Sequence, residues 1–290
     1  MTVHVLLVSG STYADPVETI DKIFRSASTG QAVKIVEIGS GTGIATRLLL
    51  QAGARHDGIK RLGAYEPSIG MLHHLRQSLF GDQKTSGLVQ ELKKEGKLSK
   101  DAEVVVEEGA FDSYQAGSDN DLVVVAQAFH WCPDLNKAVE HFAQSLRRNG
   151  VLALLWNLED RDAAPWVARV REIYEQYEAG APQYRHMQWK KMLDTPSFKK
   201  YFETLDESHQ RRSVPTTIDG VVDRMLSKSY ISVLPEADQI RLVKQVRSVF
   251  DEPDAEIGRE WIDKAAGVFT YPYGTDLFLY RRKEDQATGR

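Results

Sequence analysis

Hydrophobic residues in the first half of the chain alternate between short β-branched runs and longer stretches with helical spacing. The short runs predict strands, and the longer stretches predict amphipathic helices. The predicted helices cover residues 16–27, 43–52, 68–79 and, with Asp134 as a cap, 134–148. The predicted strands cover residues 33–38, 60–66, 104–107, 121–127 and 151–157. Strands that alternate with helices in this way predict a parallel sheet covered by helices on both faces.

The pattern changes in the second half. Residues 163–265 are mostly helical in spacing and rich in aromatic residues, with a strand predicted near 201–215. A last strand is predicted over 274–282, whereas the lysine-rich residues 81–101 predict a solvated helix or loop. We therefore expect a core over residues 1–160, a mainly helical region over 161–265, and a closing strand and tail over 266–290.

Three alternating glycines follow the strand over residues 33–38. Gly39, Gly41 and Gly43 lead directly into the helix over 43–52. A strand, a glycine loop and a helix N-terminus in this order let the backbone approach a nucleotide-type cofactor closely. A dinucleotide fingerprint would need its last glycine at position 44, where the chain has Ile44. A dinucleotide cofactor, and the hydride transfer that it would carry out, is therefore the weaker interpretation.

Two acidic residues lie near this loop in the predicted sheet. Glu37 precedes the first glycine inside the strand, where it can meet an ammonium group. Glu66 ends the second strand, about 20 residues after the loop, where a ribose-binding acid is expected. An ionised carboxylate can accept hydrogen bonds from both vicinal hydroxyls of a ribose.

Two further motifs follow in order, residues 109–112 (Gly-Ala-Phe-Asp) after the third strand and 121–131 at the fourth. Together with the glycine loop and Glu66, they resemble the motifs of class I S-adenosylmethionine (SAM) dependent methyltransferases. Residues 126–131 (Ala-Gln-Ala-Phe-His-Trp) are similar to the small-molecule subgroup called methyltransferase type 11. That subgroup includes trans-aconitate, cantharidin and fungal thiol methyltransferases. The resemblance covers roughly residues 33–157.

The resemblance implies a Rossmann-like, doubly wound, seven-stranded α/β sheet closed by an antiparallel hairpin, with a helical lid inserted over the cofactor. SAM would be the cofactor and S-adenosylhomocysteine its product. The implied acceptor is an oxygen or sulfur atom (carboxylate, hydroxyl or thiol) of a small molecule, with secondary metabolites among the candidates. The implied cofactor-binding residues are Glu37, Gly39, Ser40, Gly41, Thr42, Gly43, Glu66, Pro67, Ala110, Phe111, Asp112 and Gln127.

The acceptor is expected at the carboxyl ends of the strands, where open α/β sheets bind ligands. The candidate substrate-binding residues are Tyr13, Phe129, His130, Trp131, Trp156, Asn157 and Tyr230. His130 is also the candidate catalytic residue, because histidine titrates near neutral pH. Two interpretations stay open: a general base for a thiol or hydroxyl, and a residue that shapes the pocket. A carboxylate acceptor needs only orientation.

Two alternative functions use the same motifs. One is a methyltransferase-like protein that holds SAM as an electrostatic aid to a pericyclic or isomerase reaction. The other is a binding protein without turnover. Formation of S-adenosylhomocysteine would distinguish both from a methyltransferase.

Composition limits the partners and the location. The net charge of −4 lacks the basic excess that nucleic-acid binding usually needs, so we expect a small-molecule substrate. Cys132 is the only cysteine, which excludes an intrachain disulfide and favours a reducing compartment. No segment has the roughly 20 apolar residues of a membrane span, so we expect a cytoplasmic protein. We also expect a monomer or weak homodimer. The histidine spacing indicates no metal site.

Overall fold

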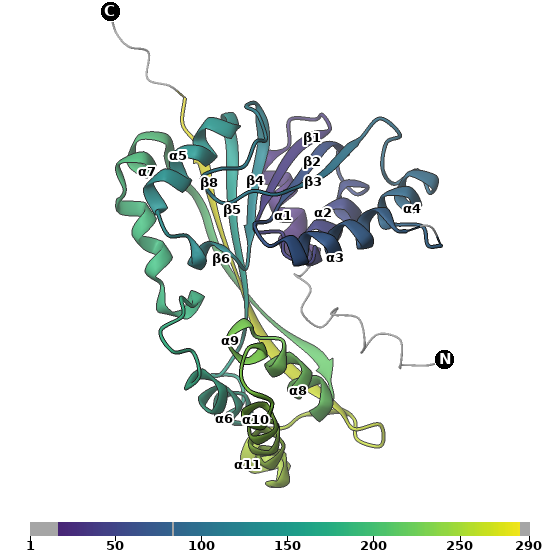
Figure 1. Cartoon of the computed structure of the whole chain (residues 1–290), viewed down its shortest axis with the longest axis vertical. Coiled ribbons are helices and arrows are strands. Elements are labelled where there is room, and N and C mark those ends of the chain that lie inside the picture. Colours follow the sequence, from purple (N-terminus) through teal and green to yellow (C-terminus); the bar gives the residue numbers. More distant parts are fainter. Residues whose placement is uncertain (1–16, 83, 285–290) are drawn as a thin grey trace, which may run out of the picture. The chain divides into compact units, whose positions relative to one another are not determined.

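We analysed a computed structural model of the chain, which describes residues 17–82 and 84–284. Eight strands in these residues form one sheet, whose main order is β3-β2-β1-β4-β5-β8-β6 (Figure 1). The eighth strand, β7, pairs with β8 outside this order. The strands are β1 Val33–Ile38, β2 Ile59–Tyr65, β3 Glu103–Glu107, β4 Asn120–Ala126, β5 Leu146–Glu159, β6 Phe202–Thr216, β7 Trp261–Asp263 and β8 Val268–Arg282.

The first five strands are parallel, as the alternating pattern predicts. β1 lies between β2 and β4, β2 pairs with β3, and β4 pairs with β5, each in the parallel direction. Seven strands lie in the main order, which confirms the predicted mostly parallel seven-stranded sheet. The three-residue β7 adds a short antiparallel pair with β8.

The helices α2, α3, α4 and α5 lie between the parallel strands β1 to β5 in the chain order. The α-helices of the described residues are α1 Val17–Ala27, α2 Ile44–Gly53, α3 Ile69–Phe80, α4 Leu88–Lys94, α5 Leu135–Ser145, α6 Pro165–Glu175, α7 Pro196–Tyr201, α8 Ile218–Leu226, α9 Ser229–Ser232, α10 Glu236–Ser248 and α11 Asp254–Ile257. Short 3₁₀ helices are η3 Phe129–Trp131, η4 Tyr184–His186, η5 Gln188–Asp194 and η6 Val249–Asp251.

The central strands are buried on both faces. Leu122 and Val124 of β4 pack into the core cluster with α1, α2 and α3, whereas Val123 and Val125 point to the opposite face and are equally inaccessible. Successive side chains of a strand alternate between faces, so both faces must be covered. Accordingly, α1 packs on α2 and α3 on α4, whereas α5 packs on α7 and η5.

The chain divides into two compact units. Within the described residues, the loop unit comprises 17–156, 182–208 and 276–284, and the helical unit comprises 157–181 and 209–275. The core of the helical unit is aromatic: the Trp166 ring packs against Phe250, Phe269 and Tyr271. Residues 182–208, inside the region expected to form a lid, belong to the loop unit. The proposed domain bounds and the lid stay predictions.

The structure corrects several of the predicted elements, among them the fifth strand, which covers Leu146–Glu159 and not 151–157. The helix predicted over 134–148 is α5, which ends at Ser145, because Leu146 already pairs with Asn120 of β4. The last strand, β8, begins at Val268 and not at 274. Phe269, Tyr271 and Tyr273 of its first part lie at every second position, which is the period of a strand. The lysine-rich stretch contains α4, whose Val89 and Leu92 are buried in the core. The β-branched run at residues 3–8, which favours a short edge strand, lies outside the described part of the chain.

Candidate functional site

The glycine loop depends on glycine for both its conformation and its packing. Gly39, Gly41 and Gly43 have φ angles of 70°, 56° and 87°, in the left-handed region that side chains disfavour. A Cβ atom on Gly39 would lie 2.5 Å from the Cβ of Ala128, and one on Gly43 would lie 2.2 Å from Cδ1 of Leu75. The loop is therefore held closely between the end of β4 and α3.

Gly41, at the middle of the loop, has more room. The nearest atom to a Cβ built there is Sδ of Met71, at 4.0 Å. The loop then enters α2, whose N-cap Gly43 provides no side-chain hydrogen bond to the first turn. Uncapped amides at a helix N-terminus favour a negatively charged or polar ligand group. The loop thus provides backbone donors beside a space without a side chain.

Glu66 joins the end of β2 to this loop. Its side chain is buried, and Oε2 accepts a hydrogen bond from the Gly41 amide at 2.9 Å. Oε1 accepts a second one from the Ser68 amide at 3.0 Å. Each oxygen has a further lone pair, so the carboxylate can still accept hydroxyl donors. Its orientation is set before any ligand binds.

Glu37 lies inside β1 and is buried. Arg47 of α2 is the neighbouring charge: burial lowers the pKa of Arg47, and attraction to Glu37 opposes that shift. The Arg47 guanidinium also donates to the carbonyl of Thr42 at 3.0 Å and to Oγ of Ser78 at 3.2 Å. Arg47 therefore braces the glycine loop, a role that sequence reasoning missed. Arg47 lies one turn into α2, the helix that follows the glycines. That position is the sequence signal from which this role could have been predicted.

The other predicted cofactor residues of the loop differ in exposure. Ser40 is buried, and its hydroxyl donates to the carbonyl of Tyr65 at 3.3 Å. Thr42 and Pro67 are exposed at the surface. Met71, which sequence reasoning also missed, has 44% of its surface exposed beside Gly41. An apolar side chain with half its surface free next to the glycine loop is suited to contact a ligand there.

Residues after β3 approach the end of β4. The half-buried Phe111 ring packs edge-on against Phe129, with ring centroids 5.7 Å apart. The amide of Ala110 donates to Oγ of Ser113 at 3.3 Å, and Asp112 is exposed. The structure therefore brings residues 110–112, which are predicted to bind the cofactor, next to η3.

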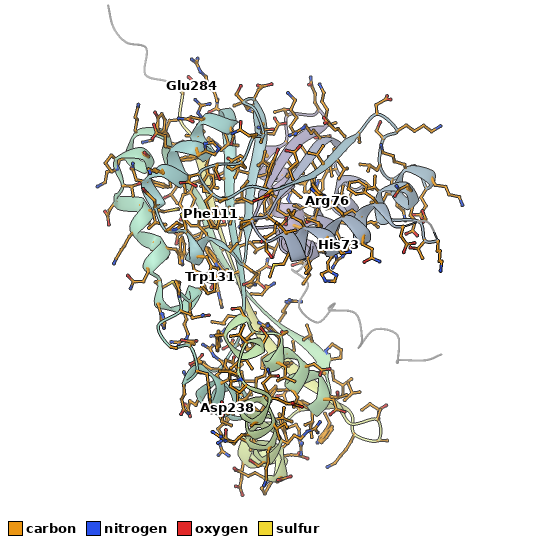
Figure 2. The ribbon with its side chains drawn as sticks, viewed as in Figure 1. His73, Arg76, Phe111, Trp131, Asp238 and Glu284 are labelled. Atoms are coloured by element: carbon orange, nitrogen blue, oxygen red, sulfur yellow. The ribbon has the colours of Figure 1, made fainter. Side chains whose placement is uncertain are left out.

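The segment after β4 has a strained turn. Gln127 has a φ angle of 58°, and its amide donates to the carbonyl of Leu155 at 2.8 Å. A non-glycine residue in this conformation costs of order 1–3 kcal/mol and is typical of functional sites. Phe129 is fully buried, whereas Trp131 is 44% exposed. Figure 2 labels Trp131 and Phe111, which both belong to the loop unit.

His130 is held by a buried tryptophan. The indole Nε1–H of Trp156 donates to Nδ1 of His130 at 3.2 Å. Burial lowers the pKa of His130 to about 4, so the imidazole is neutral at physiological pH. Trp156 is fully buried and stacks on Tyr184, with ring centroids 4.6 Å apart. Trp189 packs on its ring as well, at 4.5 Å.

Three predicted substrate-binding residues lie elsewhere in the chain. Asn157 and Tyr230 belong to the helical unit, and Tyr13 lies outside the described residues. The side chain of Asn157 is buried, and its Oδ1 accepts a hydrogen bond from Thr275 at 2.6 Å. Burial raises the pKa of the Tyr230 hydroxyl. The role of these three residues stays a prediction.

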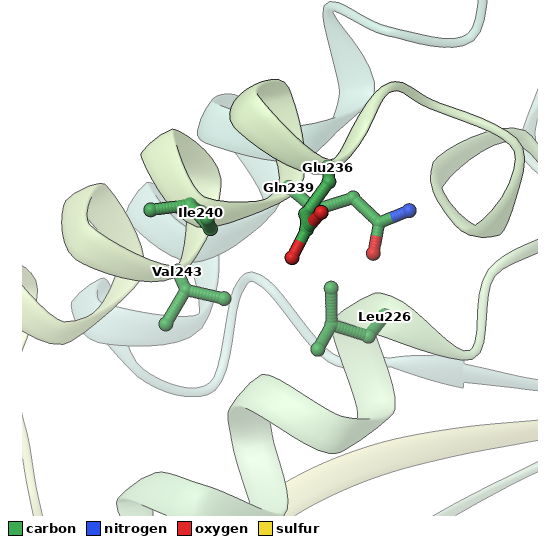
Figure 3. A pocket seen from close by; sticks show the side chains of 5 residues that line it. All are labelled: Leu226, Glu236, Gln239, Ile240 and Val243. Carbon is green, nitrogen blue, oxygen red and sulfur yellow. The ribbon is translucent and has the colours of Figure 1, made fainter.

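A small cavity lies within the helical unit, between α8 and α10 (Figure 3). It has a volume of about 300 Å³ and is lined by Leu226, Glu236, Gln239, Ile240 and Val243. It contains none of the residues predicted to bind cofactor or acceptor. In residues 17–82 and 84–284, no three His, Cys, Asp or Glu side chains are grouped to hold a metal ion. Likewise, no helix in this part of the chain has the length and apolar character to cross a membrane.

Sequence comparisons agree with these motifs. A family model described as a methyltransferase domain matches residues 36–152. An uncharacterized methyltransferase of Mycobacterium tuberculosis is 25% identical over 234 residues, which cover 81% of this chain and 78% of the relative. Another uncharacterized methyltransferase, from Schizosaccharomyces pombe, is 37% identical over 60 residues, or 21% of this chain and 23% of the relative.

Solved structures support the fold. A proposed type II methyltransferase of Anaeromyxobacter dehalogenans superposes with a TM-score of 0.58 at 13% identity, covering 92% of this chain and 96% of the other. A proposed methyltransferase of Bacillus halodurans has a TM-score of 0.54 at 14% identity, covering 92% and 100%. At these identities the likeness concerns the fold alone.

Proposed function

We propose that this chain is a class I SAM-dependent methyltransferase that transfers the methyl group to an oxygen or sulfur atom of a small molecule. The observation that carries the cofactor assignment is the hydrogen bond from the Gly41 amide to Glu66. It joins the two motifs that would bind the methionine end and the ribose of SAM into one prearranged surface.

Different residues of the loop unit would bind the methionine end, the ribose and the adenine of SAM. The glycine loop and the first turn of α2 would receive the methionine end, where the space at Gly41 admits a ligand. Glu66 would accept the ribose hydroxyls through its remaining lone pairs. Phe111, with backbone groups of Ala110, would contact the adenine, and Met71 provides apolar surface beside the loop.

Bound SAM supplies a methyl group activated by a positively charged sulfur. The work left to the protein is to align the acceptor and to exclude water, because proximity and orientation account for much of such a displacement. Phe129 and Trp156 are fully buried, and Trp131 presents a partly exposed aromatic surface at the end of β4. Trp131 would form the wall against which a small acceptor is oriented, and the buried Phe129 and Trp156 would hold this part of the chain in place.

The cofactor assignment is tested by calorimetry of SAM and S-adenosylhomocysteine binding. Glu66→Ala removes hydrogen bonds to a charged group, each worth about 1.5–3 kcal/mol, so we expect affinity to fall roughly 10-fold or more. Glu91→Ala, at an exposed acid of α4, is the matched control and should bind as the wild type does. Unchanged SAM affinity in Glu66→Ala would contradict the assignment.

The reaction class is tested separately. Incubation with SAM and candidate acceptors should produce S-adenosylhomocysteine at a rate that depends on the acceptor. Tight SAM binding without any S-adenosylhomocysteine would point instead to the pericyclic reaction or to a binding protein.

A further inference from the structure

The hydrogen bond between Trp156 and His130 determines which nitrogen of the imidazole carries its proton. An indole N–H can only donate, so Nδ1 of His130 must accept and has no proton of its own. In the neutral ring the proton is then on Nε2. Within residues 17–82 and 84–284, Nε2 makes no hydrogen bond. The edge of the ring that remains for a ligand is therefore a donor.

The surroundings of Trp156 keep this arrangement in place. The indole is fully buried and is packed by Tyr184, Trp189 and Phe278. The Tyr184 hydroxyl donates in turn to Asp276. Packing on several sides prevents the indole from turning its N–H away from His130, so the tautomer is set by the tertiary structure.

A general base must offer a lone pair to the proton that it removes. The only lone pair of this neutral ring lies on Nδ1, which the indole N–H already occupies. An alcohol or thiol acceptor could accept a hydrogen bond from Nε2–H, but its own proton would still have to leave. A carboxylate is already ionised and needs only a donor that fixes its orientation.

Resting on the methyltransferase function proposed above, we propose that His130 donates Nε2–H to the carboxylate of the acceptor, and that the product is a methyl ester. The carboxylate oxygen forms the new bond to the methyl carbon while the carbon–sulfur bond breaks and its electron pair stays on sulfur. No proton is taken up or released. His130 thus selects an oxyanion, and Trp156 is the residue that positions His130.

Burial of the ring acts in the same direction, because it lowers the pKa of His130 and keeps the ring neutral. Charged side chains on the elements next to His130 are Lys190, Lys191 and Asp194 of η5, together with Asp112 and Asp134 near Cys132. Burial accounts for the lowered pKa of His130, to which none of these charges contributes. Geometry, and not a neighbouring charge, therefore defines the donor.

The tautomer is measured by NMR of the ¹⁵N-labelled imidazole in the full chain at neutral pH. We expect a protonated Nε2 and an unprotonated Nδ1, with the His130→Gln variant identifying the signals. Trp156→Phe keeps an aromatic ring but removes the N–H, so we expect a mixture of tautomers. Trp189→Phe is the matched control, because it alters the same buried cluster, and Nε1 of Trp189 makes no hydrogen bond in the described residues.

A protonated Nδ1 in the wild type, or an unchanged tautomer in Trp156→Phe, would overturn the donor role. Kinetics give a second measure. His130→Leu should raise the KM for the acceptor about 10-fold or more, whereas His130→Gln keeps a donor and should restore most of this loss. A loss in kcat alone that depends on pH, with no rescue by Gln, would indicate a base.

The acceptor class is tested with methyl-labelled SAM and the small-molecule fraction of a cell extract. A methyl ester releases labelled methanol in alkali, whereas methyl ethers and thioethers do not. We expect alkali-labile label, and alkali-stable label would overturn the carboxylate assignment. Failure of transfer despite SAM binding would contradict the methyltransferase function itself, while the NMR result still decides the tautomer.

Discussion

The loop unit and the helical unit place their polar groups in different ways. In the loop unit the sheet core is apolar, and the functional polar groups are backbone amides and Glu66 at the strand ends. In the helical unit, a fully buried carboxylate, Glu159, lies among cations and aromatic rings. In the loop unit, glycines leave backbone amides free to bind polar groups at the strand ends. In the helical unit, oppositely charged side chains pair inside the core.

The buried charges of the helical unit form one network. Glu159 contacts Nε of Arg224 at 2.8 Å and Nζ of Lys228 at 3.1 Å, and its carbonyl accepts from Arg171 at 2.8 Å. Burial alone would raise the pKa of Glu159, but the charges of Arg224 and Lys228 hold it well below its ordinary value. Two cations share this carboxylate, and burial lowers the pKa of Lys228 to about 8, with Arg224 adding to the shift.

The largest effect is expected from Glu159→Gln. This change leaves Arg224 and Lys228 buried without their shared counter-charge, and removal of one partner of a buried pair costs about 3–5 kcal/mol. Glu172→Gln is the control, because that carboxylate is 63% exposed in its pair with Arg161 and is expected to cost at most about 1 kcal/mol. Urea unfolding gives the free energies, and hydrogen exchange shows whether the loss lies in the helical unit. Equal costs for the two variants would refute the role of the network.

A smaller effect is expected from Gly39→Ala in the loop unit. The new Cβ would meet the Cβ of Ala128, an atom that cannot rotate away, in a residue with φ of 70°. Gly30→Ala has a similar φ of 76° and no neighbouring atom within 4 Å, so it controls for backbone strain. We expect Gly39→Ala to cost about 1–3 kcal/mol more than Gly30→Ala, the usual cost of overpacking. Similar unfolding energies would mean that only the backbone conformation requires glycine here.

The smallest effect concerns the pH dependence set by Lys228. Its pKa is about 8 in the folded chain and about 10.5 when unfolded, so the unfolded state binds more protons between these values. The folded state should therefore gain stability as the pH rises from 8 towards 10, at up to roughly 1 kcal/mol per pH unit. Unfolding of the wild type and of Lys228→Met at several pH values measures this slope. The exposed Lys244→Met variant controls for net charge, and an equal slope in the wild type and Lys228→Met would exclude Lys228 as its source.

Much of the loop unit could be predicted from consecutive residues. The strand at Val33–Ile38 was predicted with its observed bounds, and the three glycines at 39, 41 and 43 form a loop between β1 and α2 where the sequence predicts one. Element ends were less predictable. The helix α5 stops at Ser145 because the residues that follow it pair with β4, which begins 26 residues earlier, at Asn120.

The sequence by itself determined the parallel sheet, the glycine loop and the position of Glu66, because strand and helix periods and glycine conformation are local properties of the backbone. Only the tertiary structure decided the bracing of the loop by Arg47, the inclusion of residues 182–208 in the loop unit, and the state of His130. The tautomer and pKa of His130 depend on burial and on Trp156, 26 residues away in the chain. Hydrogen-bond partners and desolvation are set by packing between distant segments, which the spacing of residues along one segment does not contain.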